Sequence, residues 1–233
     1  MPAPIHAILH DTTITMKKTK RSERHLMVYL SAQDVDVVRD RMPAETKTRL
    51  RDVFLVGRSR GVRSLGAVTI RGRRDVELCA CLPPRVSLRR FIYQGQSPTE
   101  FGAPRRGQWP PWAVRRFLLY DVFLHELGHL QLVNAKSKNW RRKYAGETWA
   151  EEFADGWRRR LFAKPFPHCD PVHNAPTEEE RAGLELWERL DKAQRYQLAL
   201  LTTKAPHEVG LDLSFLGGMS NEQELFLRRL LYQ

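Results

Sequence analysis

Residues 113–133 read AVRRFLLYDVFLHELGHLQLV, and this stretch decides both the fold and the chemistry expected of the chain. It is preceded by Pro110 and Pro111, which suit a first helical turn because the N–H that proline lacks has no partner there. Apolar side chains occur all round the helical wheel of these residues, as in a helix that is covered on every side. The pattern therefore predicts a helix buried in the core.

Within this predicted helix, His125 and His129 are one turn apart and project from the same face, so both imidazoles can reach a single metal ion. Glu126 stands beside the first histidine, where a carboxylate can take a proton from a metal-bound water. This is the HExxH arrangement of zinc metallopeptidases. The alternative is a core helix with hydrogen-bonded histidines, because polar groups on a buried helix need a partner in either case.

A catalytic zinc ion usually takes three protein ligands and keeps a fourth position for water. The next predicted helix offers Glu147, Glu151 and Asp155, which are spaced by four and share one face, whereas Glu152 points away from it. Residues 151–155 read EEFAD and match the pattern ExxAD. The third ligand is therefore expected on this helix.

HExxH followed by ExxAD resembles the gluzincin branch of the zincin metallopeptidases, which is thermolysin-like in its site, over residues 113–162. The resemblance implies that His125, His129 and Glu151 bind one Zn²⁺ ion and that Glu126 is the catalytic general base. It also implies that Asp155 orients His125 from behind, since such a carboxylate fixes the tautomer of a ligand histidine.

Two alternatives remain open for the acidic residues. Thr148 and Glu151 also fit a capping box, in which Thr148 would begin the helix and Glu151 would fold back onto the backbone. Glu147 is the third ligand if the register of the helix differs. For the donor that stabilises the oxyanion, four side chains qualify by chemistry only: Tyr144, His168, His173 and His207.

Short runs rich in β-branched and apolar residues predict strands at 53–56, 65–70 and 76–82, with 71–75 as the turn of a hairpin. Helices are predicted at 33–52, with an interruption near Pro43, and at 178–201 and 222–232. The expected fold is α+β: a minimal zincin-like domain with a small, mostly antiparallel sheet on the buried active-site helix, and additional C-terminal helices. An edge strand of that sheet can hold an extended peptide.

The chain divides into three expected parts. Residues 1–25 end in a basic run and predict a poorly ordered arm or a short strand. Residues 26–163 form the metallopeptidase domain, and 164–233 form a proline-rich loop and a helical extension packed on the same domain. The sequence shows no apolar stretch of membrane-spanning length and no convincing signal peptide.

The chain has 233 residues, 42% of them hydrophobic, which suits a folded protein with a sizeable core. Its three cysteines indicate no disulfide framework and fit a reducing cytoplasm. Cys79 and Cys81 are expected to be buried packing residues. His168, Cys169 and His173 match no strong template for a second metal site.

The formal net charge is +12, and the basic residues cluster. The clusters are Arg71, Arg73 and Arg74; Arg89 and Arg90; Arg105 and Arg106; Arg115 and Arg116; Arg141, Arg142 and Lys143; and Arg158, Arg159 and Arg160. They predict either a surface that attracts nucleic acid or an acidic partner, or a solvated arginine-rich surface.

The function expected from these features is that of a soluble, zinc-dependent metallopeptidase acting on a peptide or protein substrate. The alternative is a regulatory or nucleic-acid-associated zincin-fold protein with narrow or no general peptidase activity. A purely structural zinc site is a third hypothesis, disfavoured because three ligands leave one position open.

Overall fold

The computed structural model describes residues 26–57, 64–69, 74–84, 86–132, 140–203, 218 and 220–223. The predicted N-terminal arm, residues 1–25, and most of the predicted helix at 222–232 lie outside the described residues. The three-part division of the chain stays a prediction.

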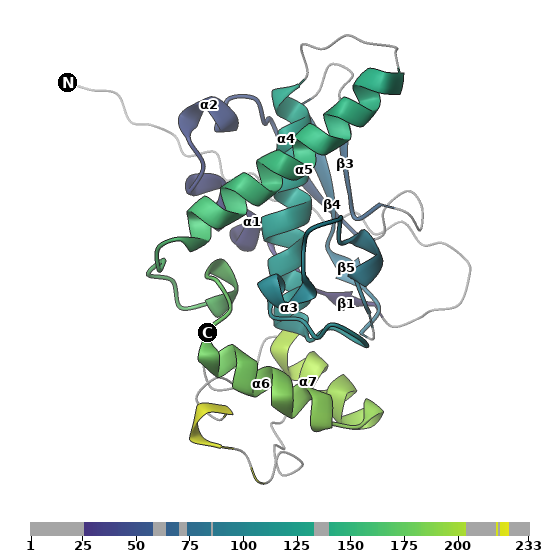
Figure 1. Ribbon diagram of the computed structural model, residues 1–233, viewed down its shortest axis with the longest axis vertical. Coiled ribbons are helices and arrows are strands. Elements are labelled where there is room, and N and C mark those ends of the chain that lie inside the picture. The colour runs from purple at the N-terminus through teal and green to yellow at the C-terminus, as the bar shows by residue number, and fades with distance from the viewer. Residues whose placement is uncertain are drawn as a thin grey trace, which may run out of the picture.

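The described residues form an α+β fold, as predicted (Figure 1). In chain order the strands are β1 (Met27–Val28), β2 (Val53–Val56), β3 (Gly66–Thr69), β4 (Asp75–Cys79) and β5 (Cys81–Leu82). The helices are α1 (Ala32–Asp40), α2 (Ala44–Lys47), η1 (Arg89–Phe91), η2 (Pro98–Phe101), α3 (Pro111–Phe117), η3 (Leu118–Phe123), α4 (Leu124–Gln131), α5 (Trp140–Phe162), η4 (Pro171–His173), α6 (Glu178–Arg189) and α7 (Lys192–Thr203).

The strands make two small sheets. In the larger, β4 is central, with β2 parallel on one side and β3 antiparallel on the other. The single strand predicted at 76–82 is split at Ala80, because the backbone changes partners there: the N–H of Ala80 donates to Val56, while its carbonyl accepts from Tyr29. Beyond Ala80, β5 pairs with β1 in the second sheet.

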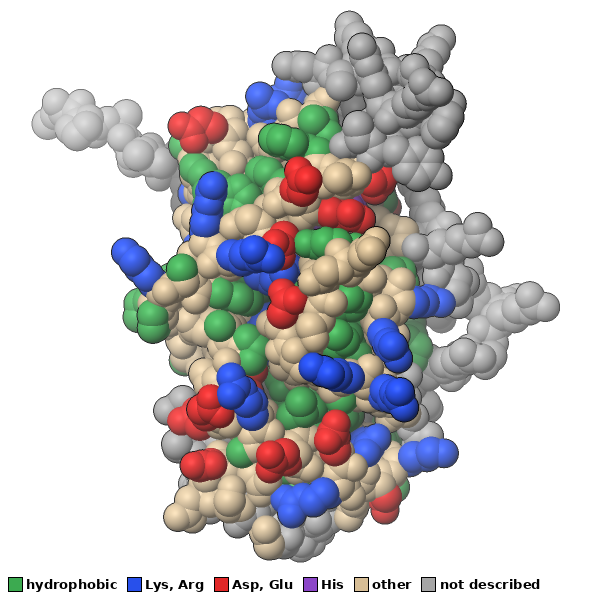
Figure 2. Space-filling model, viewed as in Figure 1, with side chains coloured by type: hydrophobic (Ala, Val, Ile, Leu, Met, Phe, Trp, Pro, Cys, Tyr) green, Lys and Arg blue, Asp and Glu red, His purple; other side chains and the backbone are tan. Residues whose placement is uncertain are grey.

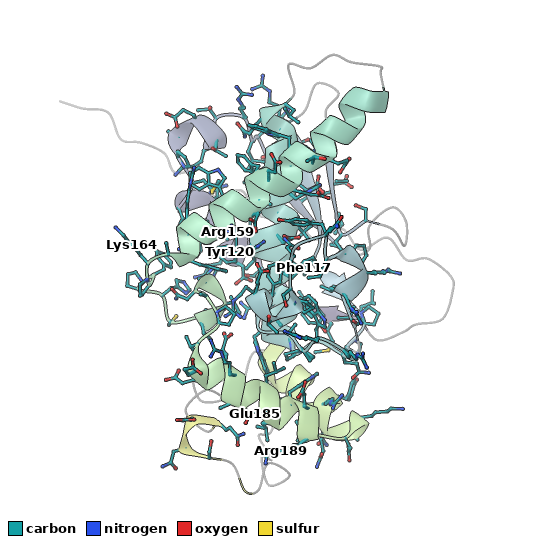
Figure 3. The ribbon with its side chains drawn as sticks, in the orientation of Figure 1. Phe117, Tyr120, Arg159, Lys164, Glu185 and Arg189 are labelled. Carbon is teal, nitrogen blue, oxygen red and sulfur yellow. The ribbon has the colours of Figure 1, made fainter. Side chains whose placement is uncertain are left out.

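The predicted buried helix runs without a break from α3 through η3 into α4. Phe117 and Tyr120 lie in this central helix (Figure 3), and both are fully buried. The middle segment, η3, is π-helical rather than α-helical, a feature that the sequence did not predict. Short π-helical insertions are frequent at functional sites, and this one ends two residues before His125, the first HExxH residue.

Helix α5 crosses over α4 (Figure 1), and the two pack closely at Gly128. A Cβ atom at Gly128 would lie 2.9 Å from the Cα of Ala150, so only glycine fits at this crossing. Because α5 begins at Trp140, Thr148 is in the middle of the helix. The capping-box interpretation of Thr148 and Glu151 is therefore wrong.

The C-terminal helices pack on α3 through the rings of Trp112 and Trp187, whose centroids are 6.0 Å apart. Helix α6, along which Figure 3 labels Glu185 and Arg189, opens with the expected N-cap, Thr177. The helix predicted at 178–201 is broken at Leu190, where the backbone is extended. Asp191 then caps α7 by accepting from two backbone N–H groups. This cap favours the start of a new helix over the continuation of α6.

Three arginines of the predicted basic surface lie in the interior instead. Arg116 is fully buried and forms an ion pair with Glu180, while Arg115 bridges Asp34 and Asp170. Arg158 is 2% exposed and bonds three carboxylates. On the face drawn in Figure 2, Lys and Arg side chains alternate with Asp and Glu rather than forming one basic field. Arg71, Arg73 and the side chains of 141–143 lie outside the described residues.

No helix among the described residues is long and apolar enough to cross a membrane. The predicted burial of Cys79 and Cys81 is confirmed, and neither forms a disulfide within the described residues.

A second buried polar cluster surrounds His173 at the end of the proline-rich loop. Its Nδ1 lies 3.0 Å from the hydroxyl of Tyr120, which itself accepts a hydrogen bond from Arg41. The same hydroxyl donates to the backbone carbonyl of His173 at 3.4 Å. Burial, together with the neighbouring His168 and Arg115, lowers the pKa of His173 to about 4, although Asp170 and Asp34 oppose the shift.

This burial predicts a pH dependence of stability. The unfolded chain protonates His173 near its ordinary pKa of 6.5, whereas the folded protein does so only near 4. The unfolded state binds more protons between these values, so the free energy of unfolding should fall by up to about 3 kcal/mol as pH drops through this interval. His173→Asn keeps an acceptor for Tyr120 and should lose less stability, as measured by urea unfolding across the interval. An equal loss in both proteins would contradict this prediction.

Candidate metal centre

Two histidines of α4 and one glutamate of α5 bring their side-chain tips together. The Nε2 atoms of His125 and His129 are 3.0 Å apart, and each lies 3.4 Å from Oε2 of Glu147. The three side chains are partly exposed, so solvent and substrate can approach them. Among the described residues, one further group of three potential ligands has its ligand atoms within 4.8 Å of one another: Asp34, Asp170 and His173.

The spacing of the three potential ligand atoms fits a zinc ion. Zinc ligands at 2.0–2.1 Å in a tetrahedral arrangement are about 3.3 Å from one another. The observed triangle has edges of 3.0, 3.4 and 3.4 Å. Two imidazoles and one carboxylate are also a donor set found in catalytic zinc sites that keep one position open.

The charge states of these groups suit a cation. Hydrogen bonds with His125 and His129 hold the pKa of Glu147 well below its ordinary value, so this carboxylate is ionised near neutrality. Burial opposes charge on His125, but the hydrogen bond with Glu147 and the nearby Glu126 outweigh it and raise the pKa of that imidazole. The site thus attracts positive charge.

The structure brings Glu147, rather than the expected Glu151, next to the two histidines. Glu147, which the sequence left open as an alternative, completes the triad, and Glu151 is not a member of the group. The reason is the crossing of the helices: α4 touches α5 at Ala150, and Glu147 precedes that contact by three residues on the side of the two histidines.

The expected role of Asp155 is also corrected. Its two carboxylate oxygens pair with Arg158 and Arg159 rather than with His125. Within its own helix, His125 interacts electrostatically with Glu126 and also with Asp121, which lies one turn earlier. Asp121 was not predicted, although its position one turn before His125 was a usable signal.

Glu126 lies beside the triad and is 7% exposed. Burial raises the pKa of its carboxyl above the ordinary value, against the opposing effect of His125 and His129. Strand β3 covers this side chain: a Cβ atom on Gly66 would lie 2.7 Å from Oε1 of Glu126. Within the described residues, β3 pairs with β4 alone and forms an edge of its sheet next to Glu126.

The remaining candidate residues are elsewhere or outside the described side chains. His168 and His173 lie in the second cluster, with their ring centroids 4.5 Å apart. Tyr144 and His207 lie outside the described side chains. In the second cluster, Arg115 forms ion pairs with both Asp34 and Asp170, so its guanidinium already balances the charge of those carboxylates. The predicted grouping of His168, Cys169 and His173 as ligands is not among the compact groups of the described residues.

The close contact at Gly128 predicts a steric effect. Gly128→Ala should push α4 and α5 apart, lower the free energy of unfolding by about 1–3 kcal/mol and weaken metal binding between these helices. Gly156→Ala is the matched control, because a Cβ there meets nothing within 4 Å and should stabilise α5 by up to about 1 kcal/mol. Urea unfolding and zinc titration measure both effects. Equal behaviour of the two variants would contradict the importance of the crossing.

In comparisons with protein-family models, curated proteins and solved structures, nothing matches this chain.

Proposed function

We propose that this protein is a zinc-dependent metallopeptidase in which His125, His129 and Glu147 bind the metal. The observation that carries the proposal is the convergence of these three side chains next to the buried Glu126. Three ligands leave a position for water, and a carboxylate beside that position has a use in hydrolysis that it lacks in a structural site.

A bound zinc ion would acidify its water and polarise the carbonyl of the substrate. Glu126 takes the proton from the attacking water and passes it to the departing amine. Its burial favours this role, because a general base works best when its pKa lies closer to the operating pH than that of an exposed carboxylate.

The edge strand β3 supports a peptide as the substrate class. Its backbone packs against Glu126, and Ala67 on the same strand is exposed. An extended peptide can add to such an edge through main-chain hydrogen bonds, which would place one of its carbonyl groups near the metal ligands. Cys79 and Cys81 are buried and form no disulfide within the described residues, which fits a reducing compartment, and we propose the cytoplasm as the location of the protein.

The proposal is tested with the purified full chain and a library of quenched fluorescent peptides. We expect cleavage that is lost on treatment with 1,10-phenanthroline and returns when zinc is added in slight excess. A protein that binds zinc with His125, His129 and Glu147 but cleaves no peptide in the library would contradict the peptidase assignment.

The nucleic-acid alternative has less support, since Arg115, Arg116 and Arg158 are engaged in internal ion pairs. Other arginines that are adjacent in the sequence are exposed and could contact a nucleic acid: Arg89 and Arg90, and Arg105 and Arg106. Binding of duplex or single-stranded DNA with a steep dependence on salt would favour this alternative, and absence of binding at low salt would remove it.

A further inference from the structure

We infer that Asp121, and not Asp155, is the carboxylate that positions His125 for metal binding. The inference rests on the proposed zinc site and adds a residue to it. Asp121 contacts neither the substrate nor the metal in this assignment; it acts through His125.

The continuous helix η3–α4 places the two residues together. Asp121 precedes His125 by four residues, and helical side chains lean toward the N-terminus of their helix, so the imidazole of His125 leans over the turn that carries Asp121. The Nε2 atom of His125 faces the triad. Its other nitrogen, Nδ1, is adjacent to the carbon that joins the ring to the helix and therefore faces the helix side, where a carboxylate can accept its proton.

A network of hydrogen bonds fixes Asp121. The carboxylate is 7% exposed, and its Oδ1 accepts from the side-chain amide of Gln96 and from Nη1 of Arg158 at 3.1 Å. Both donors bind the same oxygen, and we assign the other oxygen, Oδ2, to His125. Arg158 supplies the positive charge that a buried carboxylate needs in order to stay ionised.

Arg158 is itself held from two further sides. Its Nη2 donates to Glu100 at 2.7 Å and also to Asp155. Glu100 is fixed in turn by the backbone N–H of Ser97 at 2.8 Å, in the capping box of η2. Asp155 therefore belongs to the support of Arg158, one step further from the histidine than Asp121.

The experiment compares zinc affinities of full-length variants by competition with a chromogenic chelator. Asp121→Asn keeps the shape of the side chain but removes its charge, and we expect its zinc affinity to fall about 10- to 100-fold. Asp155→Asn should lose less than Asp121→Asn. Asp36→Asn, which changes an exposed carboxylate paired with Arg39, should bind zinc like the wild type.

A second pair of variants keeps the test valid if Asp121→Asn folds poorly. Gln96→Ala removes one donor to Asp121 and should weaken zinc binding, whereas Gln94→Ala, two residues away and exposed, should not. The melting temperature of each metal-free variant is measured alongside, so that a loss of affinity is separated from a loss of folding.

The inference is overturned if Asp121→Asn binds zinc as tightly as the wild type, if Asp155→Asn loses at least as much affinity, or if Gln96→Ala and Gln94→Ala bind zinc equally. These outcomes are distinct from failure of the proposed function. Zinc-loaded wild-type protein that cleaves no peptide would contradict the peptidase assignment and leave the affinity comparison standing.

Discussion

Glu126→Gln should lower the rate of peptide hydrolysis by about 100- to 10,000-fold, because it removes the only proton acceptor that we assign to the attacking water. Zinc affinity should change little, since Glu126 is not one of the three ligands. The amide has nearly the size of the carboxyl, so it should keep the contact with Gly66 of β3. Peptide cleavage and zinc content are measured on the same preparation.

Glu152→Gln is the matched control for this change. Glu152 lies on α5, is exposed and is not a member of the triad. It should retain full activity and full zinc content. Undiminished hydrolysis in Glu126→Gln would remove this residue from the mechanism, and a parallel loss of zinc would show that the substitution disturbs the ligands instead.

Local rules of sequence predicted much of the fold. Pro43 interrupts the first helical region as expected, because proline begins a helix more easily than it continues one. Thr177 caps α6, and the apolar wheel predicted for residues 113–133 is a largely buried helix as far as Gln131. These features depend on residues close together in the chain, and short-range patterns describe them well.

Features that depend on distant residues were not predicted. Arg115 and Arg116 are adjacent in the sequence and were predicted to be surface charges. Their partners are Asp34, Asp170 and Glu180, which are far away in the sequence. Pairing of this kind depends on the tertiary fold, and composition does not show it. The π-helical segment η3 likewise has no sequence signal that we recognise.

The third metal ligand illustrates the same limit. The sequence placed Glu147, Glu151 and Asp155 on one face of a helix, and the choice among them required the position of α5 along α4. That position is set by the contact of Gly128 with Ala150. The spacing within one helix therefore limits the candidate ligands to three acids on one face. The crossing of α4 and α5 then determines which of them, Glu147, lies next to the histidines.

This selection predicts opposite results for two neighbouring acids. Glu147→Ala should lower zinc affinity more than about 100-fold, exceeding the effect expected of residues that only support a ligand, because two histidines alone hold the ion poorly. Glu151→Ala, one turn further along α5, should bind zinc like the wild type. Metal content after dialysis and competition with a chelator measure the two affinities.

The two variants, Glu147→Ala and Glu151→Ala, also distinguish the ligand set described above from the one that the ExxAD pattern implies. If Glu151→Ala loses zinc and Glu147→Ala keeps it, α5 binds the metal in a register one turn away from the one described, and the contact of Gly128 with Ala150 would have to shift as well. Gly128→Ala should then have no effect on zinc affinity. Because the two experiments depend on one helix crossing, agreement between them would establish the crossing as the feature that determines the ligand set.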